Sequence, residues 1–590
     1  MARLPAGPGG TKYAVAINKW SLKPLVCPDW SVWSIDLLEW SPMGTANWKC
    51  FAIPAIPRKW SFVVFTVLVV VLGMCPARSW AQDSSIKLRQ GTVQGVVREA
   101  SNREIYAYLG IPYALPPVGN LRFKPPQRHN GWNSTLYAHE MGAACPQPFL
   151  MGVQISEDCL TLNVWIPELP RGFRQYPVVV VVEGELFVTS AASRFPGQDL
   201  AAFDLIVVSL NYRTNAFGFL TWQDRVLPGN LGLRDQSLAL QWVAENIDKF
   251  GGDLSRVTLL GHSAGAASAA YHLVHPRSQG PFKQMILLSG SNLAPWALSR
   301  RPREASKRLS EHLGCGYISG STFLLQCLNT KDANQIVKAV ERLIEEGNPY
   351  FLFGPVVDTY LRQEERMVPL EPLRAVRENA NRRIPVLLGL SEDDGSVMLW
   401  KCLCLSNDLD HVAGSLGGAL HGAELAYLFA PSSYRLIFNL PLTYHEERVS
   451  QNLKRMVFTF ASSGIPFLGQ YSPRWSPYSP QSPIYASLES GQVHQGYQQH
   501  QVAFWNYLMP ELAHMVTSDP NAKTTQSTST HTTAPTTESQ IITPGSDNVS
   551  YQSAVWVLVA VILLLLAVIV AYIVCSRRRQ MLHSNTLSDQ

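Results

Sequence analysis

The stretch VTLLGHSAGAASAAYHL, from Val257 to Leu273, joins a short apolar run to a run of small residues through a glycine-flanked serine. The apolar run predicts a buried strand, and the small-residue run predicts a helix that begins directly after the serine. Gly261 and Gly265 flank Ser263 in a Gly-x-Ser-x-Gly string. A serine on a sharp strand-to-helix turn is typical of a catalytic nucleophile, and a glycine-rich turn with an idle serine is the alternative.

Other apolar runs of the same kind predict further strands that would form a sheet with this one. They are short, β-branched and continuous rather than alternating, which is typical of strands buried on both faces of a parallel sheet. A helical pattern at 232–250 separates the second run from the third. We therefore predict one α/β domain with a mostly parallel, doubly wound sheet and no internal repeat. The runs lie at 176–184, 203–212, 257–261, 284–290 and 384–390.

The composition is that of an ordinary globular protein. The 590 residues are 46% hydrophobic, and the net charge is only +5. No basic-aromatic stripe accompanies that small charge, so we expect no nucleic-acid partner. Ten cysteines are too few for a small disulfide scaffold. We also expect neither a cofactor nor a metal site.

Two apolar runs determine the expected compartment. The first, Ser61–Met74, follows two basic residues and is too short to cross a bilayer comfortably, but it suits the core of a signal peptide. We expect a signal-peptide-like segment at 58–81 with cleavage after Ala81, and a buried hydrophobic helix is the alternative. Residues 1–57 are an extension to which the sequence assigns no role.

The second apolar run predicts a membrane anchor. Ala554–Val574 holds 21 apolar residues, which span about 31 Å as a helix and match the hydrocarbon core. Three arginines follow at 577–579, so the short tail at 575–590 is expected in the cytoplasm. We predict a single-pass type I protein of the plasma membrane. A glycolipid-anchor signal is the alternative, but the arginines argue against it.

A polar segment separates the predicted anchor from the predicted globular domain at 82–515. Residues 516–553 are rich in Ser, Thr and Pro and have almost no large apolar side chains, which is typical of an O-glycosylated stalk. Two Asn-x-Ser/Thr sequons, at Asn133 and Asn548, are expected to carry glycans on an extracellular chain.

Several strings together resemble the type B carboxylesterase and cholinesterase family, a branch of the α/β-hydrolases. The resemblance covers nearly all of 82–515 and implies the α/β-hydrolase fold. Neuroligins, gliotactin and neurotactin are adhesion proteins with the same kind of domain. The strings are YLGIPYALPPVGNLRFKPP (108–126), SEDCLTLNVW (156–165), LNYRTNAFGFL (210–220), GNLGLRDQSLALQWV (229–243), FGGDLSRVTLLGHSAGAAS (250–268), LSGSNLAPWAL (288–298) and FGPVVD (353–358).

The resemblance implies a catalytic triad of Ser263, Asp394 and His421. Asp394 lies in GLSEDDGS after a strand-like run, and His421 lies in ALHGAELAYLFA. A solvated acidic loop is the alternative for Asp394. Relatives place a much longer segment between acid and histidine than the 27 positions here (421 − 394), so His421 could be displaced. Either LWKCLCL (399–405) replaces a missing sheet strand or the sheet is truncated, and an exon-skipped or mispredicted chain is a further alternative.

The string EGELF at 183–187 departs from the family where the oxyanion hole is expected. Active relatives carry His-Gly-Gly-Gly-Phe there, whose glycine amides face the developing oxyanion. Glu185 and Leu186 occupy the two donor positions here, and Glu183 replaces the histidine. Glycine allows backbone angles that these residues do not favour, and a Glu185 carboxylate has the wrong charge for an oxyanion site. We expect the amide of Ala264 to be the chief surviving donor.

The family also implies supporting residues. Disulfides are expected between Cys145 and Cys159 and between Cys315 and Cys327, in an oxidising compartment. Trp296 resembles the acyl-pocket tryptophan of cholinesterases, although a simple core aromatic is the alternative.

Two functions remain open at this stage. One is an impaired serine carboxylesterase acting weakly or not at all on small carboxylic esters. The other is a non-enzymatic adhesion or receptor ectodomain that binds a cell-surface protein. The stretch 494–515 could serve a homodimer through a C-terminal helix, as in the family, but no feature of the sequence requires it.

Overall fold

The computed structural model describes residues 84–496 with internal gaps. The gaps are 149–151, 171, 173, 276–281, 317–319, 347–352, 380–383, 393, 395–420, 439–440, 468–474 and 480. The chain divides into two compact units, Met1–Val502 and Ala503–Gln590, and every described residue lies in the first. The predicted leader, stalk, membrane span and tail, and the LWKCLCL string, lie outside the described residues.

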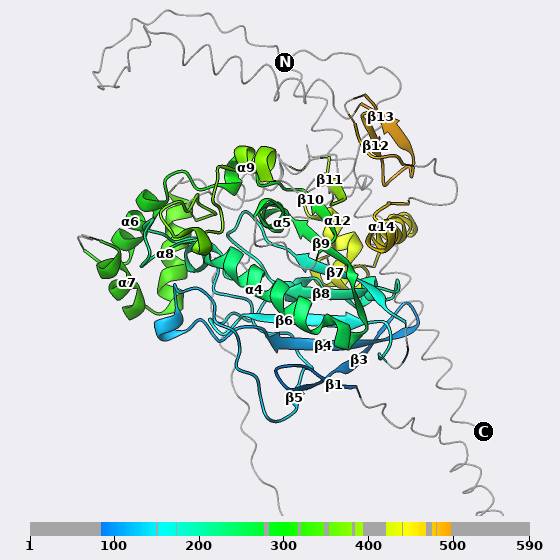
Figure 1. Ribbon diagram of the computed structural model, residues 1–590, viewed down its shortest axis with the longest axis horizontal. Coiled ribbons are helices and arrows are strands. Elements are labelled where there is room, and N and C mark those ends of the chain that lie inside the picture. Colours follow the sequence, from blue (N-terminus) through cyan, green and yellow to red (C-terminus); the bar gives the residue numbers. More distant parts are fainter. Residues whose placement is uncertain are drawn as a thin grey trace, which may run out of the picture. The chain divides into compact units, whose positions relative to one another are not determined.

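An eight-stranded mixed sheet forms the centre of the described unit (Figure 1). Its strand order is β11-β10-β9-β7-β8-β6-β4-β3. The pairings among β11, β10, β9, β7 and β8 are parallel, and those among β8, β6, β4 and β3 are antiparallel. The strands are β3 (Val96–Ala100), β4 (Arg103–Pro112), β6 (Thr161–Ile166), β7 (Tyr176–Val182), β8 (Ile206–Leu210), β9 (Gly252–His262), β10 (Gln284–Leu288) and β11 (Val386–Gly389).

Each of the five predicted strands is present, and together they make up the parallel half of the sheet. The antiparallel half comes from segments that the apolar-run pattern did not single out, so the sheet is mixed rather than parallel throughout. The five parallel strands bring their carboxyl ends to one edge, where ligand sites of such sheets form. Ser263 follows β9 at that edge.

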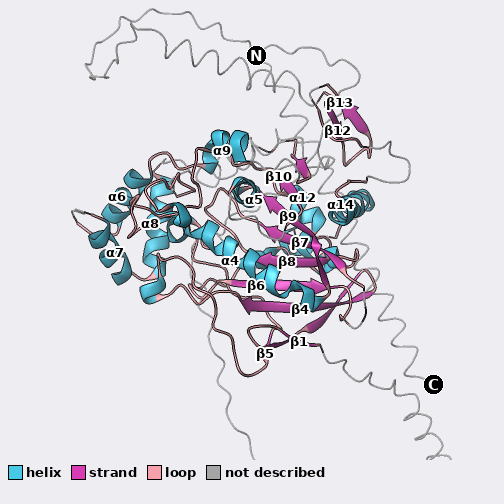
Figure 2. Ribbon diagram, in the orientation of Figure 1, coloured by secondary structure: helices cyan, strands magenta, loops and turns pink. Residues whose placement is uncertain are grey.

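Helices cover both faces of the sheet (Figures 1 and 2). Alternate residues of β7 point to opposite faces because the side-chain period of a strand is two. Val178, Val180 and Val182 pack with α4 (Leu231–Asn246) and α5 (Ala264–Val274). Val179 and Val181 pack in the opposite core with α2, α12 and α14. These three helices are α2 (Gln198–Ala201), α12 (Ala423–Leu428) and α14 (Tyr444–Ser463).

A third apolar cluster joins the segment after β7 to further helices. Leu186, Phe187 and Val188 belong to it and are buried. The helices in this cluster are α3 (Asn215–Phe219), α6 (Pro302–His312), α7 (Ser321–Thr330) and α8 (Ala333–Glu345), of which α6, α7 and α8 gather at the left of Figure 1.

The remaining regular elements are short or peripheral. They are β1 (Ser85–Lys87), β2 (Thr92–Gln94), β5 (Leu136–Tyr137), β12 (Ile484–Ala486), β13 (Val493–Gln495), α9 (Pro372–Asn379), α13 (Ser432–Phe438) and the 3₁₀ turns Gly119–Leu121, Ala192–Arg194, Ile247–Phe250, Pro295–Ala297 and Gln363–Glu365. Within the described part of the chain, none of the helices has the length and apolar character of a membrane span. The predicted span at 554–574 is not among those residues.

Candidate active site

Ser263 occupies a strained turn between β9 and α5. Its backbone angles are φ 52° and ψ −116°, in a region that non-glycine residues rarely adopt. The flanking glycines are required for packing, because a Cβ at Gly261 would lie 2.4 Å from the Gly265 carbonyl oxygen. A Cβ at Gly265 would lie 1.8 Å from the carbonyl oxygen of Val182. The turn therefore has the strand–turn–helix geometry that the sequence predicted for a nucleophile.

Within the described structure, the Ser263 hydroxyl makes no hydrogen bond to a basic side chain. Ser263 is completely buried, and its Oγ has no hydrogen-bond partner among the residues that the structure describes. A nucleophilic serine needs a base within hydrogen-bond reach of its hydroxyl. Among the described residues, no base therefore lies within hydrogen-bond distance of the Ser263 hydroxyl.

Asp394 and His421, the other two predicted triad residues, do lie together. The Nδ1 atom of His421 is 2.7 Å from Oδ1 of Asp394. Asp394 follows β11, and His421 lies two residues before α12, whose N-cap is Gly422. The short interval between them is thus long enough to bring the imidazole against the carboxylate.

The second ring nitrogen of His421, Nε2, is paired with Glu185. The Nε2 atom of His421 lies 2.9 Å from Oε2 of Glu185, so this bond uses the atom that would accept a proton from Ser263. Burial lowers the pKa of His421, but the negative charges of Glu185 and Asp394 and the hydrogen bonds to them outweigh burial and raise it to about 10. An imidazole that donates to carboxylates on both sides has no lone pair left for a serine proton.

The backbone around Glu185 forms a tight hairpin turn. Glu185 N–H donates to the carbonyl of Thr189 at 2.8 Å, and Val188 N–H donates back to the carbonyl of Glu185 at 2.8 Å. Leu186 and Phe187, at the tip, have φ values of 50° and 62°. Positive φ at both central residues is the geometry of a two-residue hairpin turn, which glycine and asparagine normally favour.

Two of the three amides predicted to donate to an oxyanion instead donate to carbonyl groups within the protein. The Glu185 amide is used by Thr189. The expectation that the Ala264 amide survives is wrong, because it donates to the carbonyl of Gly184 at 2.8 Å. The first amides of a helix lack acceptors within the helix, and the hairpin brings a carbonyl to this one. Leu186 N–H is the one predicted donor that no described backbone hydrogen bond uses.

Buried contacts hold the hairpin tip in place. The Phe187 ring lies 5.0 Å from the ring of Phe219 and 6.1 Å from that of Trp296, centroid to centroid. Asn215 N–H donates to the Phe187 carbonyl at 2.7 Å. Trp296, predicted to line an acyl pocket, thus packs against the turn itself, and its role in binding an acyl group stays a prediction.

The second carboxylate of the turn has a structural role. Glu183 is buried, and burial raises its pKa, partly opposed by Arg194. Its Oε1 accepts hydrogen bonds from the Ser190 hydroxyl and from the Ala191 amide. Glu183 therefore links the residue before the hairpin to the two residues that follow Thr189.

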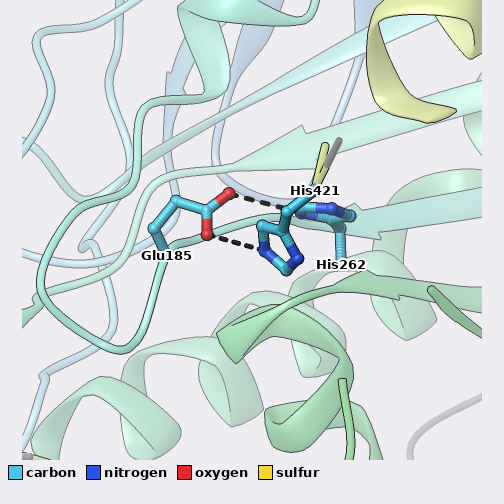
Figure 3. A group of neighbouring side chains, drawn as sticks. All are labelled: Glu185, His262 and His421. Carbon is cyan, nitrogen blue, oxygen red and sulfur yellow. Dashed lines mark hydrogen bonds and ion pairs between the residues drawn. The ribbon is translucent and has the colours of Figure 1, made fainter. Parts of the chain in front are cut away.

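Two site residues were missed by the sequence reasoning. His262, the middle residue of Gly-His-Ser, is completely buried, and its Nδ1 lies 3.6 Å from Oε1 of Glu185. Figure 3 shows both His262 and His421 facing the Glu185 carboxylate. Glu424 lies behind His262, with Oε1 3.3 Å from Nε2. Both residues stand in strings quoted for other reasons, and only folding brings them together.

Glu424 is firmly ionised. Burial raises its pKa, but the neighbouring His262 and the hydroxyl of Ser289 outweigh burial and lower it to about 2. The Ser391 hydroxyl donates to the other carboxylate oxygen at 2.9 Å. The site thus collects three carboxylates, those of Glu185, Asp394 and Glu424, around two histidines.

The supporting residues are placed as follows. The structure contains both disulfides that the resemblance implies, Cys145–Cys159 and Cys315–Cys327. Asn133 is exposed, as an N-glycan acceptor must be. Asn548 lies outside the described residues.

Comparison with known proteins gives one consistent result. The carboxylesterase family matches residues 82–412 and 405–505. A protein from Bombus ignitus named carboxylic ester hydrolase is 35% identical over 327 residues, covering 54% of this chain and 58% of that protein. Cholinesterase from Mus musculus is 36% identical over 357 residues (57% and 58%), and acetylcholinesterase from Danio rerio is 36% identical over 338 residues (54% and 52%). The aligned part spans little more than half the length of each.

Proposed function

Since the chain belongs to the carboxylesterase family, we propose that it is a carboxylesterase-like ectodomain that hydrolyses carboxylic esters weakly or not at all. The observation that carries the proposal is the use of two predicted oxyanion donors inside the protein. Glu185 N–H binds the Thr189 carbonyl, and Ala264 N–H binds the Gly184 carbonyl, each at 2.8 Å. A tetrahedral intermediate on Ser263 would find neither amide directed at its oxyanion.

The expected loss of activity is large. Removal of one oxyanion donor costs roughly 2.7–4 kcal/mol of transition-state stabilisation, so two correspond to about 5–8 kcal/mol. At 1.36 kcal/mol per factor of ten, this lowers turnover by about 10⁴- to 10⁶-fold. The bond from His421 to Glu185, rather than to Ser263, supports the same conclusion independently.

The test is serine-dependent ester hydrolysis by the purified full chain. Wild type and Ser263→Ala are compared by fluorophosphonate labelling and by p-nitrophenyl butyrate turnover, with an active family member as positive control. We expect the two proteins to be indistinguishable in both assays. Ser263-dependent turnover above about 1 per second, the low end for ordinary enzymes, would refute the proposal.

The second candidate function is protein binding by the folded domain, which does not require ester hydrolysis. We propose, as the second candidate function, that the ectodomain binds a cell-surface protein in an adhesion or receptor role. The sequence supports this through its predicted signal segment, Ser/Thr-rich stalk and membrane span, which together would display the domain at the plasma membrane as a single-pass type I protein.

Cell-surface display and aggregation test this second role separately. Intact cells that express the full chain are stained with an antibody to the domain and then mixed with unlabelled cells. Surface staining and aggregation that also occurs with Ser263→Ala would support a binding function. Staining only after permeabilisation would refute the proposed topology.

A further inference from the structure

The residues between Ser263 and the hairpin form a group that ester hydrolysis does not explain. Glu185, His262 and His421 each offer a ligand atom, and these three atoms all lie within 4.8 Å of one another. We infer that they form a binding site for a divalent transition-metal cation, best suited to Zn²⁺. This inference goes beyond the proposed function and does not depend on it.

The distances fit a zinc site. Ligand atoms about 2.0–2.2 Å from a tetrahedral zinc lie roughly 3.4 Å from one another. His421 Nε2 lies 2.9 Å from Oε2 of Glu185, and His262 Nδ1 lies 3.6 Å from Oε1 of the same carboxylate. These two separations run to different oxygens of one carboxylate and lie within about 0.5 Å of that value, and all three ligand atoms lie within 4.8 Å of one another, so side-chain adjustment would bring them around one ion. Two histidines and one glutamate are also a ligand set found in zinc enzymes.

Each histidine has a carboxylate on its far nitrogen. His421 Nδ1 lies 2.7 Å from Asp394, and His262 Nε2 lies 3.3 Å from Glu424. Metal-binding histidines nearly always place their second nitrogen against a carboxylate, a carbonyl or water, which fixes the ring and increases its basicity. Both rings are therefore oriented with the remaining nitrogen toward Glu185 (Figure 3).

His262 has no other satisfactory role in the described structure. Its ring is completely buried, and neither nitrogen makes a hydrogen bond to any residue that the structure describes. The 3.6 Å approach to Glu185 is too long for a hydrogen bond, and the contact with Glu424 is close but lacks hydrogen-bond geometry. A buried nitrogen without a hydrogen bond needs an explanation, and a coordinated cation would supply one for Nδ1, while Nε2 stays 3.3 Å from the Glu424 carboxylate.

Charge and ligand type select the class of ion. Three carboxylates face two histidines here, so a dication would neutralise excess negative charge in a partly buried region. Calcium and magnesium prefer sites built from oxygen ligands, whereas imidazole suits zinc and its first-row neighbours. A bound cation would replace the proton on Nε2 of His421, and the fourth coordination position would remain for water or a small ligand.

The binding assay uses the full chain after dialysis against a chelator. Zinc is titrated by calorimetry, and Co²⁺ is used as a spectroscopic probe because tetrahedral Co²⁺ absorbs strongly in the visible. We expect one equivalent of Zn²⁺ and a tetrahedral Co²⁺ spectrum. No esterase readout is involved, so the result is independent of whether the chain hydrolyses esters.

Variants separate this site from adventitious binding. Glu185→Gln and His262→Asn each remove a ligand and are expected to abolish the Co²⁺ spectrum and lower zinc affinity more than about a hundredfold. Glu424→Gln removes only the positioning carboxylate and is expected to lower zinc affinity by about 10- to 100-fold. His312→Gln is the matched control, because His312 also pairs with a glutamate, at 3.2 Å, but on the surface.

Folding of each variant is checked by circular dichroism, and Glu424→Gln, which leaves all three ligands, keeps the test valid if a ligand variant fails to fold. Absence of one-to-one binding in the wild type would overturn the inference. So would binding that Glu185→Gln, His262→Asn and Glu424→Gln leave unchanged, or that His312→Gln removes.

Discussion

The Glu185–His421 bond makes a measurable prediction about proton binding. In the metal-free protein, the pKa of His421 is raised from 6.5 to about 10. That difference of about 3.5 corresponds to roughly 5 kcal/mol of preferential stabilisation of the charged ring, and it leaves about one imidazole in a thousand neutral at pH 7. Glu185→Gln removes one of the two carboxylates in contact with the ring. An opposite charge at this range changes a pKa by about 1–3, so we expect the pKa of His421 to fall by that amount.

The sign of the accompanying stability change follows from linkage. A raised histidine pKa stabilises the fold fully below pH 6.5, and this stabilisation is lost as the pH rises through about 10. In Glu185→Gln the loss should begin at lower pH. Titration of ¹³C-labelled histidine by NMR, in the presence of chelator and with His421→Gln to assign the signal, measures the pKa directly. A wild-type pKa near 6.5, or one that Glu185→Gln leaves unchanged, would refute the reasoning.

Three further predictions concern stability and are checked by urea unfolding. Asp235→Asn breaks the buried bidentate pair with Arg213 and should cost about 3–5 kcal/mol, whereas Asp248→Asn, in an exposed pair, should cost less than about 1 kcal/mol; equal costs would contradict this. Burial lowers the pKa of Lys454 from 10.5 to about 8, so stability should rise by about 3 kcal/mol between these pH values, and Lys454→Met should abolish that rise. Leu186→Gly should be at least as stable as Leu186→Ala, because glycine relieves roughly 1–2 kcal/mol of strain at positive φ; a less stable glycine variant would argue against the hairpin geometry.

The parallel half of the sheet could be predicted because its signal is local. A run such as Val178–Val182 is buried on both faces, and this leaves a continuous apolar string in the sequence. The antiparallel strand β4 alternates less clearly and contains polar residues at its exposed end, so the apolar-run pattern did not single it out. The turn at Ser263 was also predictable, since close packing demands glycine on both sides.

The arrangement of the site could not be read in the same way. The contact between Glu185 and the two histidines joins segments far apart in the sequence, and it depends on where the hairpin turns. That Glu185 and Leu186 impair an oxyanion site stays a prediction, whereas the expected surviving donor, the Ala264 amide, is hydrogen-bonded to the Gly184 carbonyl. The error about Ala264 arose because the acceptor, the Gly184 carbonyl, reaches the helix only once the hairpin has formed.

The hairpin has a consequence for how this protein could change. Substituting Glu185 alone would free His421 but leave the Ala264 amide on Gly184, and substituting Leu186 alone would open a void in the buried cluster. Freeing the His421 nitrogen and freeing an oxyanion donor therefore depend on changes at different positions of one turn, so a single substitution would supply Ser263 with a base or a donor but not with both.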